Sequence, residues 1–191
     1  MSGISMANIL RHSDARRALA VCDHTISHVV EIRNAIMQRF EVSALAGSSY
    51  PLRRLGRPAE ARQRLDTAFE RLRQLKFYPA EKIEPGSEAD EVLSALAEHE
   101  AETGNAGRAL EVYQKLLDLI AAAKPKPEST LKDAVDLSRI YAAKSVLHRR
   151  AGQADLASSL DTRRRDLWRQ WDGKLPNNTF VRRQQEAASL P

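Results

Sequence analysis

A short pattern recurs three times in this chain: LGRPAEA at residues 55–61, TGNAGRA at 103–109 and AGQADLA at 151–157. The glycines of the three stretches are Gly56, Gly104 and Gly152, so consecutive copies lie 48 residues apart. In each copy an alanine follows the glycine by five positions. A single match of this kind has little weight, but three matches at one fixed interval indicate an internal repeat.

The pattern is typical of the turn between two α-helices. Glycine is favoured where a helix ends, because the left-handed backbone conformation needed there carries no penalty for a residue without a Cβ atom. Pro58 suits the first position of the following helix, where its missing N–H costs no hydrogen bond. The alanine that follows each glycine (Ala61, Ala109 or Ala157) would let the second helix pack closely on the first.

Apolar residues recur at helical spacing on both sides of these turns. The stripes that follow the turns are Ala61, Leu65, Ala68, Phe69, Leu72 and Leu75; Ala109, Tyr113, Leu116, Leu117 and Ile120; and Leu156, Leu160, Leu167, Trp168 and Trp171. The stripes that precede the second and third turns are Val92, Leu93, Leu96 and Ala97, and Ala134, Leu137, Ile140, Tyr141 and Leu147. Since no single amphipathic helix can bury its own stripe, stacked hairpins must share one core.

We therefore expect one all-α domain, residues 1–191, built as a helical-repeat superhelix of about three and a half antiparallel helix hairpins. Its expected units are an irregular first unit at 1–40, repeats at about 41–77, 87–123 and 130–172, and a C-terminal cap at 173–191. Pro51 lies inside the first helix of the first full repeat and is expected to kink it. Trp168 and Trp171 are expected to close the end of the core.

Polar residues mark several helix ends. Ser87 with Asp90, and Thr130 with Asp133, resemble capping boxes, in which two side chains bond the free N–H groups of a helix start. The segment 177–179 reads NNT, a glycosylation acceptor sequence that we interpret as a turn or helix cap because no secretory signal precedes it.

The turn and the residues after it, Ala61 to Leu65 and Ala109 to Tyr113, resemble the tetratricopeptide repeat. In that family two antiparallel helices per repeat stack into a right-handed superhelix. The usual repeat has about 34 residues, so the helices or loops here must be longer. Asp161 stands in the third copy where a large apolar residue is usual, which implies that this position is rotated or exposed.

A narrower resemblance covers roughly residues 14–183. Helical repeats of this length that close with LWRQWDGKLPNNTFV, residues 167–181, resemble the C-terminal region of acidobacterial serine/threonine protein kinases. The resemblance implies a sensor or docking region of a kinase system. The sequence has no Gly-rich phosphate loop, no His-Arg-Asp catalytic loop and no Asp-Phe-Gly triplet, so we do not expect the chain itself to transfer phosphate.

Composition excludes several classes of protein. With 42% hydrophobic and 29% charged residues, the chain is expected to fold rather than to be disordered throughout. The single cysteine, Cys22, rules out an internal disulfide and fits a cytoplasmic protein. No apolar run approaches the ~20 residues of a membrane span, and no membrane partner is expected.

Two histidine clusters are candidate chemical sites. His24 and His28 are four residues apart and could share a helix face with a metal, yet no third ligand is evident beside Cys22. His99 lies among three glutamates and could act as an acid or base, but such clusters more often form a hydrated helix face. We therefore expect no metal site, no cofactor and no catalytic residue.

Acidic and basic residues are unevenly distributed along the chain. Residues 81–111 carry nine acids against Lys82 and Arg108, whereas residues from 138 onward carry eleven Lys and Arg against five acids. The arginines of this basic part are Arg149, Arg150, Arg163, Arg164, Arg165, Arg169, Arg182 and Arg183. They suggest phosphate contacts and hence nucleic-acid binding as an alternative function, although no nucleic-acid motif accompanies them.

The leading hypothesis is a non-catalytic scaffold that binds a protein or peptide in a concave groove lined by the first helix of each repeat. By the repeat register, the groove residues are Ser43, Tyr50, Arg53, Glu91, Ser94, Glu98, Arg139, Ala142, Val146 and Arg149. Such a groove runs from acidic to basic, which suits a peptide carrying both signs of charge or a second copy of the chain. A small-molecule sensor with a deep apolar pocket is a further alternative.

Overall fold

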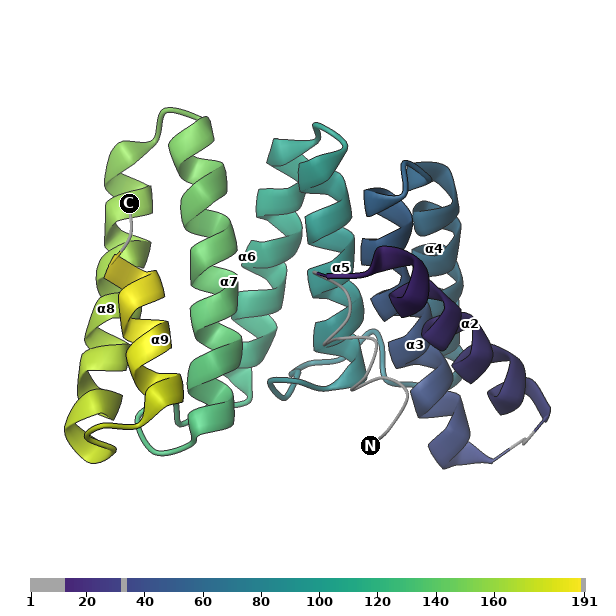
Figure 1. The fold of residues 1–191 in the computed structure, drawn as a ribbon, viewed down its shortest axis with the longest axis horizontal. Coiled ribbons are helices and arrows are strands. Elements are labelled where there is room, and N and C mark those ends of the chain that lie inside the picture. The colour runs from purple at the N-terminus through teal and green to yellow at the C-terminus, as the bar shows by residue number, and fades with distance from the viewer. Residues whose placement is uncertain (1–12, 32–33, 190–191) are drawn as a thin grey trace.

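The structure, a computed structural model, describes residues 13–31 and 34–189. Within those ranges all regular structure is α-helical, and no strand is present (Figure 1). The described residues form eight helices: α2 (Ala15–Glu31), α3 (Ala35–Arg54), α4 (Pro58–Gln74), α5 (Glu88–Glu102), α6 (Ala106–Ala122), α7 (Leu131–Arg150), α8 (Ala154–Lys174) and α9 (Thr179–Ser189). None of the helices in the described part is long and apolar enough to cross a membrane.

Three hairpins form the body of the fold: α3 with α4, α5 with α6, and α7 with α8. We call α3, α5 and α7 the first helices and α4, α6 and α8 the second helices. Each second helix begins two residues after a glycine of the repeated pattern, at Pro58, Ala106 and Ala154. Helix α2 packs on α3 at one end of the row, and α9 packs on α8 at the other end.

The three glycines adopt the backbone conformation that the sequence predicted. Their φ angles are 73° at Gly56, 92° at Gly104 and 73° at Gly152, all in the left-handed region. At the first turn the N–H of Gly56 donates to the carbonyl of Arg53 at 2.9 Å, and the next N–H donates to Leu52, so the carbonyl groups of the helix end are satisfied. The alanines five positions later are buried in all three hairpins.

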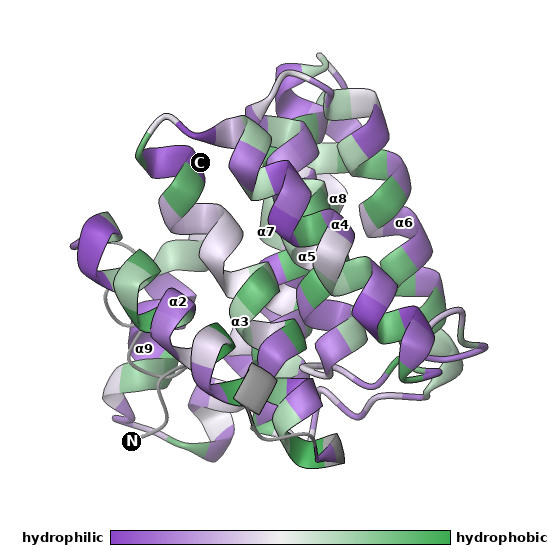
Figure 2. Cartoon of the chain, turned by 90° about the vertical axis from the view of Figure 1, so that its right-hand side faces the viewer, coloured by the Kyte–Doolittle hydropathy of each residue, from purple (hydrophilic) through white to green (hydrophobic). Residues whose placement is uncertain are grey.

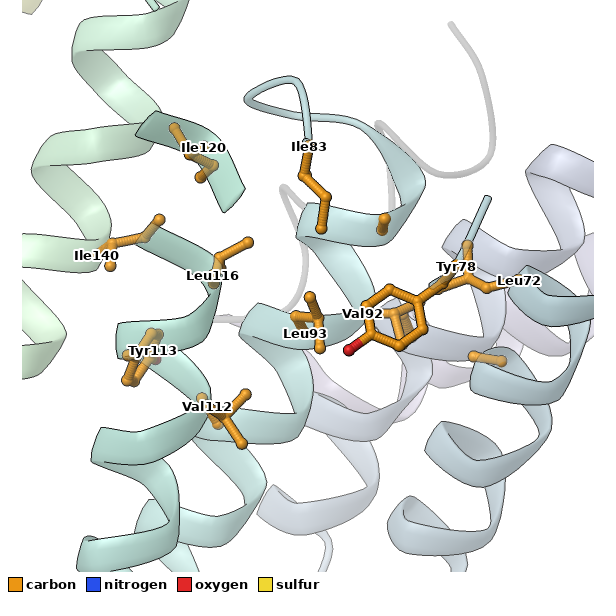
Figure 3. Close-up of a cluster of buried hydrophobic side chains, with 14 of the residues drawn as sticks. Leu72, Tyr78, Ile83, Val92, Leu93, Val112, Tyr113, Leu116, Ile120 and Ile140 are labelled. Atoms are coloured by element: carbon orange, nitrogen blue, oxygen red, sulfur yellow. The ribbon is translucent and has the colours of Figure 1, made fainter. Parts of the chain in front are cut away.

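The helices form layers. In Figure 2 the first helices lie in the middle, the second helices lie on one side of them, and α2 and α9 lie on the other side. The largest core cluster is shared by α3 to α7, and its centre includes Val92, Leu116 and Ile120, all fully buried (Figure 3). Stacking therefore buries the stripes of neighbouring hairpins against one another, as amphipathic helices require.

Helix α8 belongs to a separate cluster. Trp168 and Trp171 pack there with α9 and with the N-terminal part of α7, and both are buried, as predicted. The Trp168 Nε1–H donates to Ser138 Oγ at 2.8 Å, and the Trp171 Nε1–H donates to the carbonyl of Pro127 at 2.8 Å. The third hairpin contacts the second much less extensively than the second contacts the first.

Some local expectations were wrong. Ser87 and Thr130 do precede helices, but neither side chain caps its helix, and Ser87 Oγ has no partner in the described structure. Asp90 instead accepts a hydrogen bond from the Gly86 N–H at 2.7 Å, because the chain before α5 folds back over the helix start. Asp133 likewise accepts from the Lys126 N–H.

Boundaries at the N-terminal side also differ from the expected units. Helix α3 begins at Ala35, six residues before the position at which the first repeat was expected to start, and it continues through Pro51 to Arg54. At the other end, Asn178 Oδ1 accepts from the N–H groups of Phe180 and Val181, so the NNT segment is a helix cap.

Candidate functional site

Arg53, a residue of the predicted groove, links the first helices α3 and α5. Its side chain, 3% exposed, donates from Nε to Glu102 at 2.7 Å and lies 3.5 Å from Glu98, both on α5. Its guanidinium carbon also stands 5.7 Å from the centre of the Tyr50 ring. Arg53 and Glu98, both predicted groove residues, are therefore neighbours whose charges already satisfy each other.

Arg139 makes the equivalent link between α5 and α7. Its Nη2 lies 3.4 Å from Asp90 and 3.3 Å from Ser94 Oγ. Asp90 is fully buried and also accepts from Ser94 Oγ at 3.0 Å. Since a buried carboxylate is stable only when it is paired and hydrogen-bonded, this network holds the two first helices together.

Three of the remaining predicted groove residues, Ser43, Glu91 and Arg149, also contact neighbours. Burial raises the pKa of Glu91 above its usual value, and a hydrogen bond with Ser43 partly opposes that effect. Arg149 donates to Asp161 of α8 at 2.6 Å, so this aspartate has an ion-pair partner within the third hairpin. Of the apolar positions, Val146 is 42% exposed. We call this surface of α3, α5 and α7 the first-helix face.

A hollow lies between the second and third hairpins. It is a trough of about 1010 Å³ that is lined by α6, α7 and α8 and by residues of the loop at 124–128. Its walls and floor are Gly107, Leu110, Glu111, Gln114, Leu117, Asp118, Ile120 and Ala121 of α6; Leu137, Tyr141, Lys144 and His148 of α7; and Leu156, Ser159, Leu160 and Arg163 of α8. On each helix these residues recur at three- or four-residue spacing, so each helix contributes one continuous face.

The trough is elongated rather than round. Its α6 wall extends from Gly107 to Ala121, which corresponds to about 21 Å at a rise of about 1.5 Å per residue. Leu156 on the opposite wall is 52% exposed, although its stripe predicted it to be core. This apolar side chain is left uncovered because α6 and α8 stand apart on either side of α7, with Leu156 facing the trough between them.

Lys144 occupies the floor of the trough. The residue is 6% exposed, and its ammonium group donates to Gln114 Oε1. The amide of Gln114 in turn donates to Asp118 Oδ1 at 2.8 Å, so an amide separates the ammonium from the carboxylate. Burial, together with the positive charge of Arg163, lowers the pKa of Lys144, while Asp118 opposes that effect.

Sequence reasoning missed Lys144, yet a signal was present. The apolar stripe of α7 includes Leu137, Tyr141 and Leu147, and Lys144 stands on the same face seven residues after Leu137. A cation inside an apolar stripe is unusual, because burial of an unpaired ammonium is costly.

The two histidine clusters differ in their surroundings. His28 Nδ1 lies 3.1 Å from the carbonyl oxygen of His24, one helical turn earlier. Burial raises the pKa of the nearby Cys22 thiol to about 11, which makes it a poor metal ligand and nucleophile. The hydrated helix face favoured for the cluster of His99 was wrong, because His99 and Glu100 are both buried. The Nδ1 atom of His99 has no partner among the described residues.

Several arginines of the basic C-terminal region are paired within the chain. Arg149 pairs with Asp161, Arg169 donates to Asp166 at 2.9 Å, and Arg182 donates to Asn177. The two ion pairs, of Arg149 and of Arg169, reduce the number of positive charges free to meet phosphates, whereas Arg182 keeps its charge because Asn177 is neutral.

Comparison with known proteins gives no relative: no protein-family model, no curated protein sequence and no solved structure matches the chain.

Proposed function

We propose that this chain is a non-catalytic, tetratricopeptide-like docking module that binds a segment of a partner protein. The observation that carries the proposal is the trough of α6, α7 and α8, with Leu156 uncovered on its wall. In this proposal the three hairpins are repeats with a 48-residue period, and the module serves as the regulatory part of a cytoplasmic serine/threonine kinase system.

The shape of the trough favours a polypeptide segment over a small molecule. Pockets for small molecules are concave sites of about 300–1000 Å³ that enclose most of the ligand. The trough reaches the upper end of that range and is open along three helix faces. Covering Leu156 alone would contribute about 1 kcal/mol, since half of its side chain is already buried.

The first-helix face is the second candidate surface. Val146 is exposed there, and Glu98 and Arg139 keep part of their side chains accessible. Their charges take part in the links between first helices, however, so binding at this face would compete with contacts that hold the fold together.

Two substitutions distinguish the surfaces. Leu156→Glu places a charge on the trough wall, and Val146→Glu places one on the first-helix face; both positions are exposed, so neither change should unfold the protein. Wild type and both variants would be used to capture proteins from a lysate of the source cells, with quantification by mass spectrometry.

The proposal expects a discrete protein that is captured by wild type and by Val146→Glu and is lost with Leu156→Glu. Loss with Val146→Glu alone would move the binding site to the first-helix face. Equal capture by all three proteins would contradict docking at either surface.

A further inference from the structure

The floor of the trough holds a cation whose bonding capacity is mostly unused. An ammonium group has three N–H donors, and the only hydrogen-bond acceptor that Lys144 has among the described residues is the neutral amide oxygen of Gln114. No carboxylate of the described chain forms a salt bridge with it. A buried ammonium is normally paired, because its burial without an anion is costly.

A second cation faces the same space. Arg163 lines the trough from α8, is exposed, and has no ion pair in the described structure. Its charge is close enough to disfavour the protonated form of Lys144. The carboxylates that line the hollow, Glu111 and Asp118 on α6 and Glu128 in the loop, form no salt bridge with either cation in the described structure, so an added carboxylate beside Lys144 and Arg163 would be attracted to both.

We propose that the trough binds an amphipathic helix of the partner whose apolar face carries one acidic side chain, and that Lys144 and Arg163 hold this carboxylate. The inference rests on the docking function proposed above and names the chemistry of its partner. An amphipathic helix in an apolar groove is a common mode of peptide recognition, with anchors at three- and four-residue spacing.

The dimensions agree with that occupant. The α6 wall would accommodate about 14 helical residues along its length of about 21 Å. Leu110 and Leu117 of α6 face Leu156 and Leu160 of α8 across the floor, so both edges of the trough offer apolar contacts. These residues would cover the apolar face of the incoming helix on either side of its acidic residue.

The charges of the trough also orient the helix. Glu111 and Asp118 lie on the α6 wall, whereas Lys144 and Arg163 lie on the floor and on the α8 wall. An acidic side chain directed toward α6 would be repelled, so the carboxylate must point toward α7 and α8. Such repulsion is a general source of specificity in protein recognition.

A displayed library of random peptides of about 17 residues, the length of α6, would test the inference. Peptides would be selected on wild type, and each selected peptide would then be measured on Leu156→Glu, Lys144→Met, Arg163→Met and Lys115→Met. Lys115 is the matched control because it is an exposed lysine of α6 outside the trough, 5.3 Å from the centre of the Tyr78 ring. Thermal unfolding would verify that every variant is folded.

The inference predicts that selected peptides lose binding with Leu156→Glu and carry Asp or Glu between apolar anchors. It also predicts that they bind Lys144→Met about 10- to 100-fold more weakly, as expected for one lost charge-assisted hydrogen bond, with a smaller loss for Arg163→Met and none for Lys115→Met.

Peptides that depend on Leu156 but lack acidic enrichment, and bind Lys144→Met as well as wild type, would overturn the inference and leave the docking function standing. A selection that yields no Leu156-dependent peptide would contradict both.

Discussion

Replacement of Lys144 by methionine should stabilise the free protein. Methionine keeps a stem of the same length and removes only the ammonium group. Lys144 as a whole residue is 6% exposed, and its ammonium group is bonded to one neutral acceptor. Burial of a poorly satisfied polar group costs about 1–3 kcal/mol. We expect Lys144→Met to raise the free energy of unfolding by about 1 kcal/mol, at the low end of that range because Gln114 gives partial compensation.

Alanine at the same position separates the ammonium from its stem. Lys144→Ala also removes three buried stem atoms, at about 0.8 kcal/mol for each methylene, so this variant should be less stable than Lys144→Met by about 2 kcal/mol. Urea denaturation followed by circular dichroism would measure both differences. A methionine variant that is clearly less stable than wild type would refute the reasoning that the ammonium is a cost to the fold.

The pH dependence gives an independent check of the same effect. The pKa of Lys144 is lowered from 10.5, so the folded state binds this proton less tightly than the unfolded state does. The free-energy cost of burying the charged ammonium is therefore fully present below the pKa that Lys144 has in the folded state. It disappears above pH 10.5, the pKa of an unperturbed lysine. The stability gap between Lys144→Met and wild type should narrow as the pH rises through this window, and a gap that does not change with pH would contradict the assignment.

Three further outcomes follow from the fold. Gly104→Ala should lower the free energy of unfolding by about 1–2 kcal/mol, because the φ of Gly104, 92°, is left-handed. Gly107→Ala inside α6 should be neutral or slightly stabilising, since an added Cβ meets no atom within 4 Å at either glycine. Equal effects of the two substitutions in denaturation curves would contradict the turn assignment. Trp168→Phe should lower the free energy of unfolding by about 2–3 kcal/mol, since it leaves a void in a fully buried site and removes the hydrogen bond to Ser138. An unchanged unfolding temperature would show that this end of the core is not packed as described. Amide hydrogen exchange should show α8 and α9 opening at a lower free energy than α5 and α6, because α8 and α9 pack in a separate cluster to which only the N-terminal part of α7 contributes. Uniform protection across α5, α6, α8 and α9 would argue against that division.

The turns of this fold were predictable because their cause is local. Gly56, Gly104 and Gly152 each need a left-handed backbone, and no distant residue is required to produce it. The start of every second helix therefore followed from the sequence. The buried tryptophans were predictable for a similar reason, since large apolar residues at helical spacing near the end of a stack have few alternatives to closing the core.

Contacts between hairpins were less accessible to sequence reasoning. Ser87 and Asp90 have the spacing of a capping box, yet Asp90 bonds Gly86, Ser94 and Arg139 instead. Arg139 is far away in the sequence, and only the stacking of α7 on α5 brings it close. The register predicted which residues of the first helices share a face, but it did not reveal that several of them would satisfy one another.

The trough also depends on contacts between hairpins, so sequence reasoning did not predict it. Periodicity placed Leu156 in the core because it reports which face of α8 is apolar, and not whether another helix lies close enough to cover that face. The distance of α8 from α6 depends on how α7 packs between them, which is a property of the assembled hairpins. Lys144 carried the one local signal of the site, as a cation within the apolar stripe of its helix.

Photo-crosslinking in living source cells tests the docking proposal most directly. A photoreactive amino acid would replace Leu156 in the trough or, in a matched protein, Val146 on the first-helix face, two positions of similar exposure. The proposal predicts one discrete protein adduct from position 156 and none from position 146. An adduct from position 146 alone, or no adduct from either position, would contradict binding of a partner in the trough.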